Sequence, residues 1–194
     1  MRTAEITRRT KETDISLSIN LDGDGQYAIE TGIGFFDHML TALCVHAGFD
    51  LRIRAVGDLE VDGHHTVEDT GIVLGQAFAK ALGTKSGITR YGSAFIPMDE
   101  ALGFAAVDIS GRPFLVLNAP FQAPMIGAYD TSLTEEFFRA FAMHAGITLH
   151  ARVEYGSNDH HKCEAVFKAV AHALKAAVTL RDTDVPLSTK GVLA

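Results

Sequence analysis

The residues best suited to chemistry form a short motif that occurs twice in the chain. The motif reads His-His-x-x-Glu, and its copies span residues 64–68 and 160–164. Two imidazoles and a carboxylate within about one helical turn offer nitrogen and oxygen ligands at a spacing that suits a divalent metal. Neighbouring side chains on a helix point about 100° apart, so each histidine pair suits two ions better than one. The duplication therefore predicts two metals.

A further donor precedes each copy of the motif. When the His-Ala-Gly tripeptides at 46–48 and 144–146 are placed opposite each other, His38 falls opposite Glu136, near the start of a helix in each half. Each half then supplies one helix-borne donor, two histidines and one glutamate. The candidate metal ligands are His38, His64, His65, Glu68, Glu136, His160, His161 and Glu164.

These histidines also allow a simpler interpretation, as capping or surface residues at two helix starts, with Asp62 and either Asn158 or Asp159 as N-caps. Two copies that share a third donor favour metal binding instead. The chain has no His-Glu-x-x-His motif, so a zincin protease is not indicated. Imidazole with carboxylate suits Mn, Fe, Co or Zn, and the lack of a thiolate shell disfavours a structural zinc site.

Composition excludes several classes of protein. The chain has 194 residues, with 17 Lys and Arg against 24 Asp and Glu, and a net charge of -7 disfavours nucleic acid and anionic membranes as partners. No apolar run approaches the roughly 20 residues of a membrane span. Cys44 and Cys163 lie in apolar or motif segments without a leader, so we expect a soluble, cytoplasmic protein with no disulfide.

Scattered cations could bind a phosphate group. A hydroxyl, backbone N–H groups and an ammonium in the Gly-containing tail would form a phosphate cradle, although each cation alone is ordinarily a solvated surface charge. These candidates are Arg90, Arg112, Lys168, Ser188 and Lys190. His46 lies on a similar helix face to His38 and is either a substrate contact or a core histidine, with His144 in the matching place. We expect structural roles for His150 and His172.

The hydrophobic pattern repeats with the motif. Alternation predicts strands at 15–21 and 104–109, each followed by a turn and a second strand in a hairpin. Helices are expected up to Gly48 and from the capping-box sequence at Ser132 up to Gly146. Further strands at 51–55 and 147–153 lead to the two motifs, with another possible strand near residues 59–61. Each motif then opens an Ala-rich helix that ends near Leu82 or Leu180.

We therefore expect an α+β fold built from an internal duplication. Each unit reads strand-strand-helix-strand-helix, with an optional extra strand before the last helix and with the helices on one face of each sheet. The first repeat covers residues 1–93 and the second covers 94–194, together forming one compact domain. There is no Gly-rich phosphate loop and no dinucleotide fingerprint in a strand-to-helix context.

The motifs, in their order, resemble those of the imidazoleglycerol-phosphate dehydratase family over essentially the whole chain. The matching segments are 10–13 (Thr-Lys-Glu-Thr), 34–40 (Gly-Phe-Phe-Asp-His-Met-Leu), the two His-His-x-x-Glu motifs, 108–113 (Asp-Ile-Ser-Gly-Arg-Pro) and 188–191 (Ser-Thr-Lys-Gly). The resemblance implies a fold like the second domain of ribosomal protein S5. It also implies trimers that assemble into 24 subunits of cubic symmetry, with active sites between subunits.

The resemblance further implies two Mn(II) ions per active site. One ion is expected on His38, His65, Glu68 and His161, and the other on His64, Glu136, His160 and Glu164. The chain departs from the family's pattern at Glu136, where many members carry His. Arg90, Arg112, Lys168, Ser188 and Lys190 resemble the family's phosphate-binding set. At this length we expect no fused histidinol-phosphatase domain.

The implied activity is dehydration of D-erythro-imidazoleglycerol phosphate to imidazole-acetol phosphate in histidine biosynthesis. Coordination of the substrate ring by both ions would lower its N–H pKa and give an imidazolate, which can expel the hydroxyl through a diazafulvene-like intermediate. A carboxylate then takes the carbon proton. We expect Glu12 to contact substrate and act in catalysis, and Glu68 and Glu164 to move protons as well as bind metal.

Two functions of other classes fit the same ligands. Metal ligands on several helices could link subunits through bound ions, in a metal-dependent structural assembly without catalysis. A dinuclear metallohydrolase would instead release phosphate from the same substrate.

Overall fold

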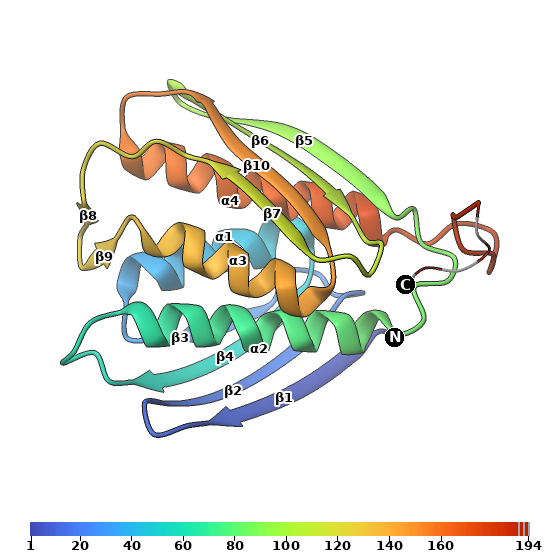
Figure 1. The fold of residues 1–194 in the computed structure, drawn as a ribbon, viewed down its shortest axis with the longest axis horizontal. Helices are drawn as coiled ribbons and strands as arrows, with labels where there is room; N and C mark the ends of the chain where they lie inside the picture. Colours follow the sequence, from blue (N-terminus) through green and yellow to red (C-terminus); the bar gives the residue numbers. More distant parts are fainter. Residues whose placement is uncertain (190, 192, 194) are drawn as a thin grey trace.

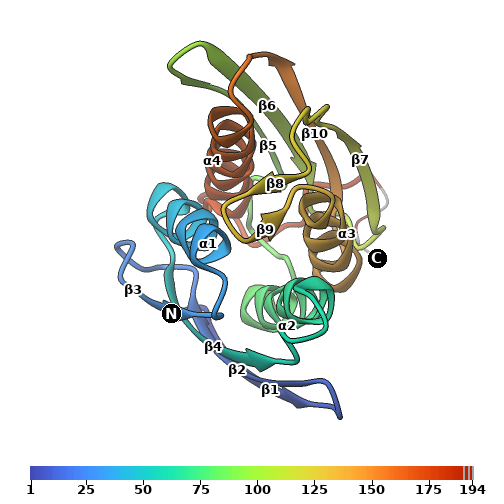
Figure 2. The ribbon, with the colours of Figure 1, turned by 90° about the vertical axis from the view of Figure 1, so that its left-hand side faces the viewer.

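Two four-stranded sheets enclose a layer of four helices (Figure 1, Figure 2). A computed structural model describes residues 1–189, 191 and 193 of the chain. The first half contains β1 (Thr3–Arg9), β2 (Thr13–Asn20), β3 (Tyr27–Glu30), α1 (Gly34–Ala47), β4 (Asp50–Gly57) and α2 (His64–Leu82). The second contains β5 (Tyr91–Met98), β6 (Ala101–Asp108), β7 (Phe114–Asn118), β8 (Met125–Ile126), β9 (Tyr129–Asp130), α3 (Leu133–Ala145), β10 (Thr148–Tyr155) and α4 (Asp159–Val178).

The duplicated α+β architecture with helices on one face of each sheet is confirmed, but its strand pairing differs from the expected hairpins. The strand orders are β1-β2-β4-β3 and β5-β6-β10-β7, so the two sheets have the same topology. β3 runs parallel to β4, and β7 runs parallel to β10. Parallel neighbours need a crossover connection, which α1 and α3 supply. The chain therefore leaves the sheet after β3 or β7, and the returning strand, β4 or β10, lies between the two strands that were expected to pair.

Two further details of the predicted strands were wrong. Each half begins with an edge strand that the pattern did not indicate, because β1 and β5 have weakly apolar inner faces and outward side chains that stay accessible. Residues 59–61 form a turn, and Leu59 and Val61 are exposed. The connection between the units lies at 83–90, so the expected division after residue 93 falls inside β5.

The core between the sheets is built from the inward-facing apolar side chains of the strands and from the apolar faces of the helices. Ile15, Leu17 and Ile19 of β2 point inward, and Leu149 and Ala151 do so from β10. α1 and α2 cover the first sheet, whereas α3 and α4 cover the second. The helices also pair across the halves, α1 against α4 and α2 against α3. Each half thus completes its core with helices of the other.

The helix ends at Gly48, Gly146 and Asn158 follow the sequence signals, whereas α2 begins after Gly63 and not after the expected cap Asp62. Gly48 and Gly146 end α1 and α3 with φ of 69° and 66°, a left-handed conformation that glycine adopts readily. Asn158 caps α4 by accepting the N–H groups of His160 and His161. The capping box at Ser132 was wrong: its backbone is helical, and its hydroxyl donates to Asp130 instead.

Close contact between α4 and its sheet explains why this helix is rich in alanine. A Cβ at Gly92 would lie 2.0 Å from the carbonyl oxygen of Ala173, and one at Gly103 would lie 2.6 Å from that of Ala165. The helix backbone therefore rests directly on β5 and β6. Since Ala165 follows Glu164, this contact also sets the height of the second motif above the sheet.

We expect Gly103→Ala to destabilise the fold, because the added methyl must push the backbone of α4 away from β6. Overpacking of this kind costs about 1–3 kcal/mol of the free energy of unfolding. Chemical denaturation followed by circular dichroism measures the change. Gly34→Ala is the matched control, since a Cβ there meets nothing within 4 Å. Equal midpoints for the two variants would contradict the close-contact account.

Candidate metal centre and active site

All four long helices begin at the same end of the molecule, on the left in Figure 1, and Figure 2 views that end directly. The sequence-predicted ligands are gathered there because each lies in the first turns of a helix. His38 is on α1, the residues 64–68 are on α2, Glu136 is on α3 and the residues 160–164 are on α4. The duplication thus places both motifs on one end of the helical layer.

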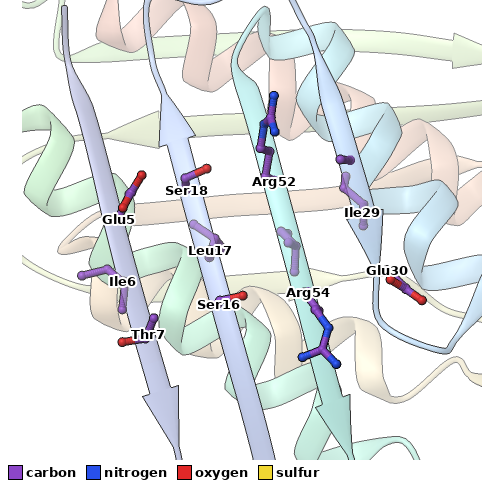
Figure 3. Close-up of a pocket in the computed structure, with 12 residues that line it drawn as sticks. Glu5, Ile6, Thr7, Ser16, Leu17, Ser18, Ile29, Glu30, Arg52 and Arg54 are labelled. Atoms are coloured by element: carbon purple, nitrogen blue, oxygen red, sulfur yellow. The ribbon is translucent and has the colours of Figure 1, made fainter.

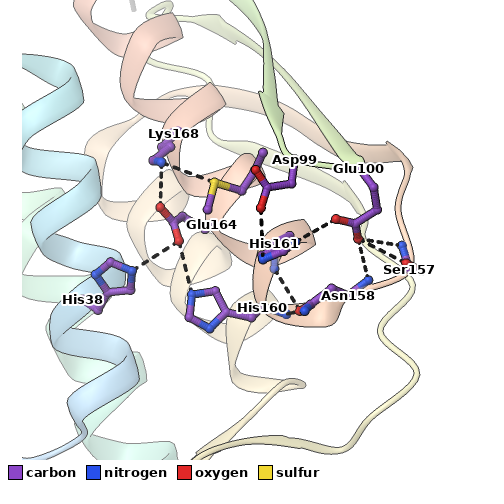
Figure 4. A network of polar contacts seen from close by, with 10 residues as sticks. His38, Asp99, Glu100, Ser157, Asn158, His160, His161, Glu164 and Lys168 are labelled. Carbon is purple, nitrogen blue, oxygen red and sulfur yellow. Dashed lines mark hydrogen bonds and ion pairs between the residues drawn. The ribbon is translucent and has the colours of Figure 1, made fainter.

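Three of the predicted ligands meet within one chain. Nε2 of His38 and Nε2 of His160 each lie 3.2 Å from Oε2 of Glu164, and the three ligand atoms are all within 4.8 Å of one another (Figure 4). Within the described part of the chain, no other set of three or more His, Cys, Asp or Glu side chains is this close. Because α1 and α4 belong to different halves, this cluster exists only once both halves have packed.

The surroundings of Glu164 favour the ionised form of its carboxylate, which is the form that binds metal. Its side chain is buried, which raises its pKa, but Lys168 Nζ at 2.6 Å and the ring of His38 outweigh that effect and bring the pKa below its usual value. An ionised, buried carboxylate between two imidazoles is the donor set that Mn, Fe, Co and Zn accept. Lys168 therefore supports the metal-type cluster directly, rather than lying with the other predicted phosphate ligands.

The first motif forms a more open group. His64 Nε2 lies 3.4 Å from Glu68 Oε2, and His65 Nε2 lies 3.9 Å from Glu12 Oε2. The β1–β2 turn thus brings Glu12 to the second histidine of the motif. Glu136 does not join this group in the chain, because Arg139 holds its carboxylate at 2.8 Å. The expected division of the eight ligands between two ions stays a prediction.

Carboxylates that the sequence pattern missed hold the second histidine of each motif. Nδ1 of His65 lies 3.0 Å from Asp58, and Nδ1 of His161 lies 2.7 Å from Glu100. These hydrogen bonds are the main cause of a raised pKa at both histidines. Glu100 and its neighbour Asp99 lie in the β5–β6 turn, far from the motif in sequence, so no local spacing could have revealed them.

His46 lies away from these ligands, two turns further along α1. Its Nδ1 is 3.2 Å from Nε2 of His172 on α4, in a half-buried pair between the helices. Burial lowers the pKa of His46, and the nearby Lys168 lowers it further. The structural role expected of His172 agrees with this position, and substrate contact by His46 stays a prediction.

Most of the predicted phosphate ligands lie at the opposite end of the molecule. Arg90, Arg112 and Ser188 line one cleft of about 870 Å³, beside the C-terminal tail. Arg90 is fixed by Asp108, at 2.7 Å, while the Arg112 side chain is two-thirds exposed. Lys190 lies outside the described residues.

The two ends are far apart along α4. The backbone N–H of Arg90 donates to the carbonyl of Ala177, which is seventeen residues beyond His160. At the rise of an α-helix, that separation is about 25 Å. A single chain therefore does not bring the cleft at Arg90 to its own histidine cluster.

Another concavity, of about 640 Å³, lies on the outer face of the first sheet (Figure 3). It is lined by backbone and by short or charged side chains, including Ser16, Ser18, Arg52 and Arg54. The helices lie behind the strands in this view.

The fold and the site together define an internally duplicated α+β protein whose helix starts carry an imidazole–carboxylate cluster of the metal-binding kind. Its residues 31–174 match the family model described as imidazoleglycerol-phosphate dehydratase. Imidazoleglycerol-phosphate dehydratases of Cereibacter sphaeroides and Methanosarcina mazei are 57% and 58% identical to it, with full coverage of both chains. The chain belongs to the imidazoleglycerol-phosphate dehydratase family.

Solved structures agree with this assignment. The imidazoleglycerol-phosphate dehydratase of Staphylococcus aureus superposes with a TM-score of 0.84 at 42% identity, covering 92% of this chain and 99% of that one. The enzyme of Pyrococcus furiosus, solved in complex with (S)-C348, gives 0.83 at 38% identity and covers 97% and 100%. The chain is thus a hydro-lyase that dehydrates imidazoleglycerol phosphate in histidine biosynthesis. This function replaces the structural assembly and the hydrolase as interpretations of the motifs.

Within the described residues, no helix has both the length and the apolar character that a membrane span requires.

Proposed function

We propose that the dehydration takes place at two Mn²⁺ ions held by the eight ligands that the duplication predicts: His38, His64, His65, Glu68, Glu136, His160, His161 and Glu164. The observation that carries this proposal is the convergence of His38, His160 and Glu164 within 4.8 Å. Their imidazole nitrogens and ionised carboxylate fit such an ion. When bound, Mn²⁺ supplies Lewis-acid charge that stabilises negative charge on the substrate's imidazole ring.

The active site is shared between chains in this proposal. The roughly 25 Å between the histidine cluster and the Arg90 region, estimated from the helical rise, far exceeds the three-carbon chain that joins ring to phosphate in the substrate. Arg112, Ser188 and Lys190 of one chain therefore bind the phosphate of a substrate whose ring meets the histidines of another. The exposed guanidinium of Arg112 is well placed for such a bridge.

An assembly of 24 subunits, built from trimers of cubic symmetry, would bring these ends together. Closed point-group symmetry repeats one heterologous contact at every subunit, so each histidine cluster gains one phosphate cleft. We place this assembly in the cytoplasm. Both cysteines are free and buried, which agrees with a reducing compartment, and burial raises the pKa of each thiol to about 12.

Proton transfers fall to the carboxylates beside the histidines. The reaction removes a proton from the carbinol carbon and releases the neighbouring hydroxyl as water. Glu164 is a poor base for the carbon proton, because Lys168 holds its Oε1 and its pKa is lowered. Glu12 is half exposed at a turn and faces His65, so its Oε2 is our choice for that proton. Glu68 and Glu164 bind metal and can relay protons to the leaving hydroxyl.

We expect Glu12→Gln to lower kcat by about 10²–10⁴-fold with a small change in KM, since a general base acts mainly in the transition state. Steady-state kinetics of dehydration measure both constants. Glu5→Gln is the control, because Glu5 lies on the outer face of the first sheet. A kcat for Glu12→Gln close to that of the control would assign the base elsewhere.

A further inference from the structure

The second histidine of each motif makes the same kind of hydrogen bond. A carboxylate from outside the helix meets Nδ1, Asp58 at 3.0 Å for His65 and Glu100 at 2.7 Å for His161. A ring that donates its Nδ1 proton to a carboxylate keeps a bare lone pair on Nε2 when neutral. The free nitrogen of each ring therefore points away from its holder.

Glu100 is itself firmly held. Its Oε1 accepts the backbone N–H groups of Ser157 and Asn158, at 3.1 and 2.7 Å, while Oε2 meets His161 (Figure 4). Asn158 in turn caps α4. The β5–β6 turn, the helix start and the imidazole are thus joined through one carboxylate, which fixes the ring without touching the space beside Nε2.

The two holders come from different places in the repeat. Alignment of the motifs puts Glu154 opposite Asp58, yet Glu154 binds Arg152 at 2.7 Å and leaves His161 to Glu100. The two halves therefore reach the same ring atom by different routes. The duplication alone does not explain why a carboxylate meets Nδ1 of both histidines, because the two carboxylates are not at equivalent positions. A requirement for the Nδ1–H tautomer at both histidines does explain it.

We propose that Asp58 and Glu100 are positioning residues that select the Nδ1–H tautomer of His65 and His161 and present Nε2 of each ring to a divalent ion. This inference rests on the proposed function of these histidines as metal ligands. In metal sites, such outer carboxylates orient the ligand and raise its basicity, and their loss typically weakens metal binding about 10–100-fold.

The test measures Mn²⁺ affinity of the metal-stripped full-length protein by calorimetry. We expect Glu100→Gln and Asp58→Ala each to raise the Kd about 10–100-fold. Glu100→Gln keeps an oxygen for the N–H groups of residues 157 and 158 but can set an amide donor against Nδ1, which favours the opposite tautomer. Glu154→Gln is the matched control and should leave the Kd unchanged.

A second readout needs no metal. Solid-state ¹⁵N spectra of histidine-labelled, metal-free protein distinguish protonated from bare ring nitrogens, and His161→Gln identifies the signals of that ring. We expect Nδ1 of His161 to be protonated and Nε2 bare in the parent protein, with this pattern lost in Glu100→Gln. Spectra that show protonated Nε2 in the parent would overturn the proposal, even if a variant folds poorly.

The outcomes separate this inference from the metal proposal beneath it. If His65→Gln and His161→Gln bind Mn²⁺ like the parent, the ligand assignment fails. If those variants lose affinity while Glu100→Gln and Asp58→Ala do not, the ligands stand and the positioning role is wrong.

Discussion

Removal of divalent metal is expected to abolish dehydration, and Mn²⁺ to restore it. The carbon proton of the substrate is only weakly acidic, and a bound ion would supply positive charge directly at the substrate's ring. Loss of that charge should lower kcat by at least about a hundredfold, since Lewis-acid stabilisation is worth several kcal/mol. Turnover of imidazoleglycerol phosphate by chelated, dialysed protein measures the effect, with metal content determined on the same sample.

Two comparisons make this result specific. Mg²⁺ should restore little, because it prefers oxygen ligands and gives up water reluctantly. His160→Ala should raise the Mn²⁺ concentration needed for half-maximal activity, whereas His150→Ala, at an exposed position on β10, should not. Sedimentation of the same samples separates lost chemistry from lost assembly. Full turnover by verified metal-free protein would contradict the dinuclear site.

Two inactive variants are expected to restore each other's activity when they share an assembly. Glu12 lies at the end of the molecule that carries the histidines, and Arg112 lies at the end that carries the phosphate cleft. In a random mixture of Glu12→Gln and Arg112→Ala chains, about a quarter of shared sites receive both parent residues. Co-expression with two different tags, followed by tandem purification and assay below KM, measures the recovery.

The matched control replaces one partner by the double variant. Glu12→Gln co-expressed with Glu12→Gln/Arg112→Ala leaves every site without the Glu12 carboxylate, so its activity should stay at the background of the single variant. If the first mixture shows no more activity than this control, both residues act within one chain, and the separation along α4 has been misinterpreted.

Local patterns predicted those parts of the fold that depend on neighbouring residues. Gly48 and Gly146 end their helices because a left-handed residue can satisfy the final carbonyls locally. Strand pairing was wrong because it depends on distant segments: nothing in the spacing of β2 and β3 shows that β4 inserts between them. The edge strands β1 and β5 were missed because their inward-facing side chains are only weakly apolar, so the alternation that predicts a strand is faint.

In the site, too, the sequence predicted the residues that belong to local motifs and missed those that only the fold brings near. The two motifs and the alignment of His38 with Glu136 came from the sequence, and the structure brings His38 to the second motif. Asp58, Asp99 and Glu100 were not found, because they reach the histidines from turns whose positions only the folded chain defines. Lys168 was placed with the phosphate ligands by its charge and by the family resemblance, and the structure places its ammonium beside Glu164.

The pairing of α1 with α4 also bears on how such a chain could arise. His38 comes from the first half, whereas His160 and Glu164 come from the second. A half-length ancestor could therefore have assembled this cluster only as a dimer of two identical chains. In the duplicated chain that contact is intramolecular, so the two halves need not be identical. The difference between His38 and Glu136 at matching positions is a divergence that no symmetric dimer could have acquired.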